Sequence, residues 1–140
     1  MDITRELIYE SDFSKMYLEK DLSLMYVELL GVIDNENYKA TFNMMSEKAL
    51  ENGVKRLLVN QSTMQKSSME AKAWLVTKWL PSARQTFGDR MRAGIVLSKS
   101  IFIKIGGEYI ISAVRTISKF DVRSFGDVES ARTWLLNDLN

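Results

Sequence analysis

The sequence predicts an α/β fold, with a mixed central β-sheet of about four to six strands and helices packed on it. Residues 22–30 and the apolar run at residues 57–59 both have the composition of buried strands. Between them, apolar residues recur at helical spacing until Gly53. A strand, a helix and a strand in this order form a right-handed crossover with parallel strands.

The amino-acid composition is that of an ordinary globular protein. The 140 residues are 46% hydrophobic and 26% charged, so we expect a single domain spanning residues 1–140. The net charge is only +1, from 19 basic and 18 acidic residues. This balance does not favour a nucleic-acid partner or an anionic membrane surface.

The chain contains neither cysteine nor histidine. Disulfides, thiolate nucleophiles and the commonest general base and metal ligand are therefore excluded. Any catalysis would depend on carboxylates, lysine, tyrosine or serine, so we expect a protein that is not an enzyme and needs no cofactor.

The first residues, MDITRELIYESD, lack the apolar core of a signal peptide. No apolar run approaches the roughly 20 residues that span a bilayer. We therefore expect a cytoplasmic protein without a transmembrane segment.

The first elements are expected to be strands. Leu7-Ile8-Tyr9 is apolar, a polar cluster follows, and residues 13–20 then alternate, which predicts a hairpin at the edge of the sheet. In residues 22–30 both faces are mostly apolar, which predicts a strand covered on both sides and ended by Gly31. Glu28 is the exception, and it is either paired inside the protein or directed to solvent.

A helix should follow, capped by Asp34 or Asn35. Its buried stripe comprises Tyr38, Phe42, Met45 and Ala49, and it should end near Gly53. Residues 55–60 then form a second central strand.

The remaining elements continue this alternation. Residues 69–80 predict a buried helix that Pro81 should stop or kink, because proline lacks the N–H. A turn at residues 87–89 and a third strand at residues 91–97 follow. Residues 101–119 are ambiguous, with a helix expected from about Glu108. The chain closes with a strand at residues 121–125 and a helix capped by Asp127, in which Val128, Ala131 and Leu135 share one face.

This pattern resembles the STAS domain, the fold of anti-sigma-factor antagonists. It is most similar to the small stand-alone branch called SpoIIAA-like, which is related in fold to the lipid-binding SEC14 domain. The resemblance is carried by three stretches: Leu57-Leu58-Val59-Asn60 with its serine-bearing loop, Ala93-Gly94-Ile95-Val96-Leu97, and FDVRSFGDVESARTWLL at residues 120–136.

The resemblance implies a phosphorylatable serine just before the helix that follows the second central strand, and Ser67 and Ser68 stand in that place. The antagonists have Asp before the serine pair and Gly after it, whereas this chain has Lys66 and Met69. The same serines are also good helix caps, and the two roles are compatible.

The loop at residues 60–68 is the first candidate site, because ligands and partners meet α/β sheets at the carboxyl ends of the strands. Its candidate residues are Asn60, Lys66, Ser67 and Ser68. They would form a switch loop that contacts a protein partner.

A second candidate is an apolar ligand pocket lined by Trp74, Trp79, Phe102 and Tyr109. The alternative for these aromatic residues is plain core packing. A loose basic region could likewise meet an anionic group or be a solvated face; it comprises Arg84, Arg90, Arg92, Lys99 and Lys104.

The sequence therefore favours a non-enzymatic regulatory or protein-interaction domain, monomeric or homodimeric. The alternative is a carrier or sensor of a small apolar or amphipathic ligand, held between the Trp74–Trp79 helix and the segment at residues 101–117.

Overall fold

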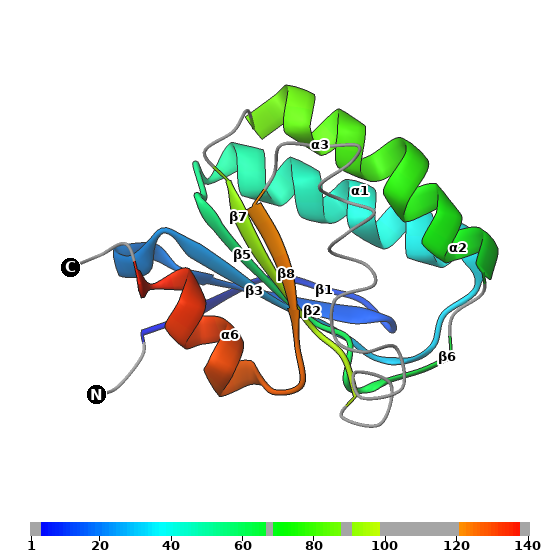
Figure 1. Ribbon diagram of the computed structural model, residues 1–140, viewed down its shortest axis with the longest axis horizontal. Coiled ribbons are helices and arrows are strands. Elements are labelled where there is room, and N and C mark those ends of the chain that lie inside the picture. Colours follow the sequence, from blue (N-terminus) through cyan, green and yellow to red (C-terminus); the bar gives the residue numbers. More distant parts are fainter. Residues whose placement is uncertain (1–3, 67–68, 88–90, 99–120, 138–140) are drawn as a thin grey trace.

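The computed structural model describes residues 4–66, 69–87, 91–98 and 121–137. A six-stranded sheet, in the order β1-β2-β3-β5-β7-β8, lies between α1, α2 and α3 on one face and α6 on the other (Figure 1). This arrangement confirms the predicted α/β fold with a mixed sheet.

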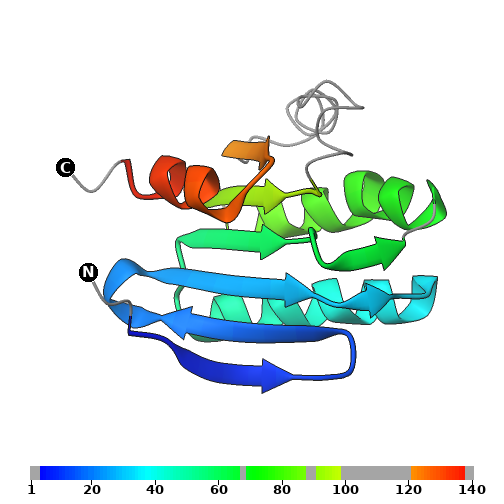
Figure 2. The ribbon, with the colours of Figure 1, turned by 90° about the horizontal axis from the view of Figure 1, so that it is seen from below.

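The sheet has an antiparallel and a parallel half. The pairs β1–β2 and β2–β3 are antiparallel, and β3, β5, β7 and β8 pair in parallel (Figure 2). Its strands are β1 (Glu6–Glu10), β2 (Ser14–Glu19), β3 (Leu24–Leu29), β5 (Arg56–Asn60), β7 (Arg92–Val96) and β8 (Asp121–Phe125). A separate two-stranded parallel sheet joins β4 (Gly31–Val32) to β6 (Met64–Lys66).

The helical elements are η1 (Lys20–Leu22), α1 (Asn35–Glu51), α2 (Met69–Trp74), the π-helical η2 (Leu75–Trp79), α3 (Leu80–Phe87) and α6 (Val128–Leu135). The predicted βαβ crossover is β3-α1-β5, and its strands are parallel as expected. The ambiguous residues 101–119 lie outside the described residues.

Strand β3 carries apolar side chains into both cores, as its sequence predicts. Met25, Val27 and Leu29 pack under α1, whereas Leu24 and Tyr26 belong to the core beneath α6. The strand begins two residues later than expected. Leu22 belongs to η1, and Ser23 takes a left-handed conformation with φ of 49° before β3 starts.

Helix α1 begins and ends as its sequence predicts. The Asp34 carboxylate accepts the Asn37 N–H at 2.8 Å, and Gly53 follows the helix with φ of +61°. The helix buries Tyr38 and Phe42, whose ring centroids lie 4.8 Å apart. Burial raises the pKa of Tyr38 well above its ordinary value of 10.0, against a hydrogen bond with Gln61 that lowers it.

The sequence predicts that Pro81 stops or kinks the helix. The proline does not stop it, because η2 continues directly into α3. The turn before it widens into the π-helix η2, where the Leu80 N–H donates to the Leu75 carbonyl five residues back. Pro81 then occupies the second position of α3. A wider turn accommodates the missing N–H and the proline ring, so the helical path continues.

Helix α6 is capped by Asp127, as predicted, and it buries Ala131 and Leu135 against the sheet. Gly94 of β7 lies directly beneath the helix, where an added methyl group would make ordinary van der Waals contacts. A methyl group at Gly94 would lie 3.4 Å from the Ala131 Cβ and 3.5 Å from Leu135 Cδ1. Among the described residues, no helix is long and apolar enough to cross a membrane.

Two arginines connect α6 to neighbouring elements. Arg132 of α6 binds Glu19 at the end of β2, and Arg56 of β5 binds the end of α6. The Glu19 carboxylate, 1% exposed, accepts from Arg132 of α6 at 2.5 and 2.9 Å and from Arg5 at 3.0 Å. The Arg56 guanidinium donates to the carbonyls of Leu135 and Leu22 at 3.0 and 2.6 Å. The strand β2, the helix α6 and the chain before β1 therefore meet at one buried carboxylate.

We expect Glu19→Gln to lower the free energy of unfolding by about 3 kcal/mol, because it leaves two partly buried guanidiniums without their anion. Urea denaturation measures this loss. Glu10→Gln is the matched control. Its partner Lys15 lies 3.8 Å away in an exposed pair, which is worth less than about 1 kcal/mol. Equal effects of the two substitutions would contradict the central role of Glu19.

The raised pKa of Tyr38 predicts a specific alkaline instability. Above about pH 10 the unfolded chain ionises this phenol while the folded chain keeps it neutral. Stability from Tyr38 is therefore complete below about pH 10 and is lost as the pH rises further. Relative to Tyr38→Phe, the wild type should lose about 1.4 kcal/mol per pH unit in that range. A difference that stays constant from about pH 8 to 11 in urea denaturation would refute the shift.

Candidate functional site

The loop after β5 leaves the sheet at the carboxyl ends of β3, β5 and β7, the edge where α/β sheets usually bind their ligands. The sequence predicts a polar loop over residues 60–68. The structure instead forms β6 within it, paired with β4 (Figure 1). The segment Met64–Lys66 has no alternating apolar pattern, and its strand partner is distant in the sequence, so local reasoning missed it.

Asn60 is a buried anchor at the base of this loop. Its side chain is 7% exposed, its Nδ2 donates to the Tyr26 hydroxyl at 2.9 Å, and its Oδ1 accepts from the Ser62 N–H and hydroxyl at 3.0 and 2.6 Å. Burial raises the pKa of Tyr26, although the bond with Asn60 lowers it. Both polar ends of Asn60 are thus used inside the protein to position the chain.

Further hydrogen bonds hold the loop to the neighbouring strands. The Gln61 N–H donates to the Val96 carbonyl of β7 at 2.7 Å. The Thr63 hydroxyl donates to the Leu29 carbonyl of β3 at 2.6 Å, and the Thr63 carbonyl accepts the Gly31 N–H at 3.3 Å. Residues 60–64 are therefore fixed to strands on both sides of β5.

The predicted switch residues Lys66, Ser67 and Ser68 follow this anchored segment in the sequence. Lys66 is the last residue of β6 and stands opposite Val32 of β4 in the register. Ser67 and Ser68 lie outside the described residues, and α2 begins at Met69. In its first turn, the Glu70 carboxylate accepts from the Asn35 side chain of α1. The helices after β3 and β5 thus start side by side.

The two described tryptophans of the predicted apolar pocket pack between α1 and the helix that follows the loop. Trp79 is 7% exposed, its indole N–H donates to the Phe42 carbonyl at 2.9 Å, and its ring lies 5.1 Å from that of Phe42. Trp74 is half-buried and meets Phe42 edge-on at 6.4 Å. Phe102 and Tyr109, the other predicted pocket residues, lie outside the described residues.

The space next to Trp79 is small. The cavity there measures about 10 Å³, the volume that one water molecule needs, and its lining is Leu57, Trp79, Leu80, Phe87, Met91, Ala93 and Val122. In the part of the chain that the structure describes, these aromatic side chains therefore pack with one another, which supports the core alternative.

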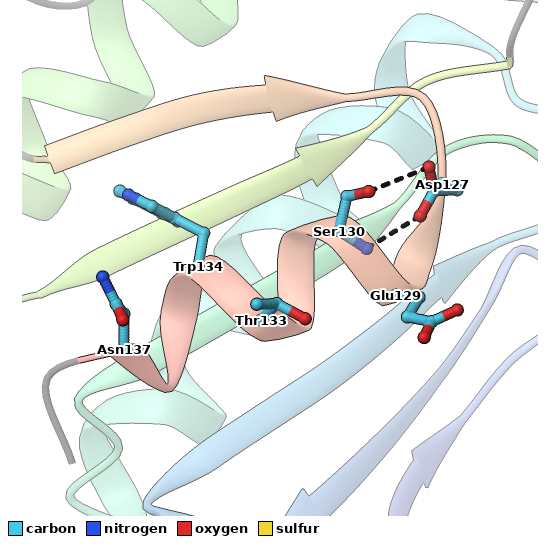
Figure 3. Close-up of a pocket in the computed structure, with 6 residues that line it drawn as sticks. All are labelled: Asp127, Glu129, Ser130, Thr133, Trp134 and Asn137. Atoms are coloured by element: carbon cyan, nitrogen blue, oxygen red, sulfur yellow. Dashed lines mark hydrogen bonds between the residues drawn. The ribbon is translucent and has the colours of Figure 1, made fainter. Parts of the chain in front are cut away.

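A shallow and largely open pocket lies on the surface of α6 (Figure 3). Its lining is Asp127, Glu129, Ser130, Thr133, Trp134 and Asn137, none of which the sequence singled out as a site. The Asp127 carboxylate already accepts from the Ser130 N–H and hydroxyl at 2.7 and 3.0 Å (Figure 3). These bonds make Asp127 a helix cap rather than a free acid or base.

Of the predicted basic region, the structure describes the side chain of Arg92. Arg92 of β7 stacks on the Trp134 ring at 4.1 Å, and Arg123 of β8 lies 5.1 Å from the same ring. The region therefore contributes Arg92 to the packing of α6. Arg90, Lys99 and Lys104 lie outside the described residues, and the Arg84 side chain is also not described.

The described residues lack the ligand cluster that a metal site requires. Within residues 4–66, 69–87, 91–98 and 121–137, no three acidic side chains gather in a way that could hold a metal ion. The loop at residues 60–64 is held in place by internal hydrogen bonds of Asn60, Gln61 and Thr63.

Comparison with solved structures supports the predicted SpoIIAA-like fold. No family model and no curated protein matches the sequence. A solved structure that matches is that of an uncharacterized protein of the DUF3478 family, with a SpoIIAA-like fold, from Shewanella loihica PV-4. The match covers 94% of this chain and 92% of that one, with a TM-score of 0.52 and 16% sequence identity. This chain has a SpoIIAA-like fold, the fold that its sequence resemblance to stand-alone STAS domains predicts.

Proposed function

We propose that the chain is a non-enzymatic regulatory domain that binds a protein partner through the loop at residues 60–69 and helix α2. The observation that supports this proposal is that Asn60, Gln61 and Thr63 anchor the loop at the carboxyl edge of the sheet. A surface that is ordered before it binds loses little conformational entropy on association, which favours recognition.

The surroundings of the loop also suit a protein partner. Val32 of β4 is 60% exposed and lies in register with Lys66. Exposed acids lie near it in the sequence or at the starts of the two helices: Asp34, Glu36 and Glu70, the last of which binds the Asn35 side chain. An apolar residue with a polar and charged rim is the usual arrangement of a protein interface.

Ser67 or Ser68 would act as the switch of this surface. A phosphate there would add between one and two negative charges just before α2, beside Lys66 and the acidic Glu70. It would change the charge that a partner meets without disturbing the buried anchors.

The same proposal covers the remaining properties of the chain. The protein would be cytoplasmic, with residues 1–140 as one domain, without a nucleic-acid partner, and either monomeric or a homodimer. A non-enzymatic role is supported by the absence of histidine and cysteine from the sequence and by the capping role of Asp127.

We expect Ser67→Asp with Ser68→Asp to weaken the captured protein complex at least tenfold relative to Ser67→Ala with Ser68→Ala. The reason is the added charge at the contact surface. The measurement is crosslinking in the native host, affinity capture of the tagged chain and quantitative mass spectrometry. The alanine pair should fold, with a loss of about 1 kcal/mol for the missing cap.

Ser82→Asp is the matched control for these variants, because Ser82 is an exposed serine of α3, outside the loop. It should leave the complex unchanged. If the alanine pair, the aspartate pair and the control all retained the same partner in the same amount, the switch loop would be refuted.

The carrier alternative receives less support, because Trp74 and Trp79 pack on α1 and the cavity beside Trp79 holds about one water molecule. It has a direct test in native mass spectrometry of protein purified gently from its host. We expect the mass of the bare or phosphorylated chain, alone or with a protein partner. A small molecule released only on denaturation, and absent from folded Trp79→Phe, would establish the carrier role instead.

A further inference from the structure

A continuous series of contacts links the N-terminal end of the chain to the loop after β5. The Arg5 guanidinium, just before β1, donates to Glu19 at 3.0 Å and lies 4.8 Å from the centre of the Tyr26 ring. The Tyr26 hydroxyl accepts from Asn60, whose Oδ1 accepts from Ser62 at 3.0 and 2.6 Å. The series thus runs from the residue before β1, through β2 and β3, to the end of β5 and its loop.

Arg5 shields the middle of this series. Tyr26 is only 6% exposed, although α6, the helix on its face of the sheet, packs mainly on β5, β7 and β8 (Figure 2). Besides the apolar cluster beneath α6 and the Glu28 side chain, its ring meets Arg5 and the half-buried Tyr17, whose centroid lies 6.1 Å away. Without Arg5, water would reach the Tyr26 ring and compete for its hydrogen bond with Asn60.

Arg5 is also the more exposed of the two arginines that bind Glu19. Its side chain is 34% exposed, whereas that of Arg132 is 15% exposed. It precedes β1, an edge strand with a register shift between Leu7 and Tyr9. When Arg5 leaves, Glu19 keeps its two bonds to Arg132, so no buried carboxylate is left unpaired.

We propose that the N-terminal strand regulates the binding loop through Arg5, which stabilises the Tyr26–Asn60–Ser62 anchor when docked and loosens it when withdrawn. The inference rests on the proposed function in that it concerns the regulation of the same loop. A partner that captures the edge strand β1 would withdraw Arg5, since an edge strand can pair with another chain and opens at low free energy.

The two states differ in what a partner of the loop must order. With Arg5 docked, Ser62 is held by Asn60 and the loop is in place before binding. With Arg5 withdrawn, the bonds of Gln61 and Thr63 to β7 and β3 remain, and the partner would have to order Asn60 and Ser62 itself, at a cost in affinity. The N-terminal strand and the loop are thereby coupled across the sheet.

Amide hydrogen exchange, followed by NMR on the full chain, tests this coupling without any partner. Arg5→Ala should raise the exchange rate of the Ser62 amide about fivefold or more, the effect of weakening one buried hydrogen bond. Tyr26→Phe, which removes the hydroxyl itself, should do the same. Arg5→Lys, which retains the cation, should have a smaller effect.

Lys48→Ala is the matched control, because it removes a partly buried cation of α1, on the opposite face of the sheet, whose partner Glu51 lies 3.6 Å away. It should leave Ser62 unchanged. The Leu58 amide of the fully buried β5 reports global opening, so its acceleration measures the general loss of stability in each variant. A larger acceleration at Ser62 than at Leu58 in Arg5→Ala and Tyr26→Phe supports the coupling.

Two outcomes would overturn the inference. One is unchanged exchange at Ser62 in Arg5→Ala, while Tyr26→Phe accelerates it. The other is an equal acceleration at Ser62 and Leu58, which would reflect a general loss of stability. Neither depends on Ser67 or Ser68, so the coupling can fail while partner binding responds to the serine variants, and the reverse result is equally distinguishable.

Discussion

The buried carboxylate of Glu19 is the interaction on which the assembly of the two chain ends depends. It receives Arg132 from the last helix and Arg5 from the first residues of the chain, at the end of β2. Helix α6 has eight residues, too few to be stable alone in water. Its position therefore comes from apolar packing over Gly94, reinforced by Arg132 and by the Arg56 contact with the Leu135 carbonyl.

The same face of the sheet connects this ionic centre to the loop after β5. Side chains on alternate residues of a strand share a face, which places Tyr26 beside Asn60 on neighbouring strands. Asn60 uses its amide on Tyr26 and its carbonyl oxygen on Ser62. The loop thus begins from a rigid base and reaches the surface beside the starts of α1 and α2.

The candidate site was only partly predictable. A polar loop after a buried strand identified residues 60–68, because strand ends in an α/β sheet are recognisable from the sequence. The role of Asn60 was not evident, since its partner Tyr26 lies in another strand. The roles of Trp74 and Trp79 were also ambiguous in the sequence. Helical spacing cannot separate a core residue from a pocket residue, whereas the Trp79 bond to the Phe42 carbonyl places it between two helices.

The sequence by itself determined the main elements, because their signals are local: apolar runs for β3, β5 and β7, Asp34 and Asp127 as caps, and Gly53 after α1. Only the tertiary structure decided the pairing of β4 with β6, the π-helical turn before Pro81, and the convergence of Arg5 and Arg132 on Glu19. These features depend on residues far apart in the chain or on how packing resolves a local conflict, and no pattern of neighbouring residues encodes them.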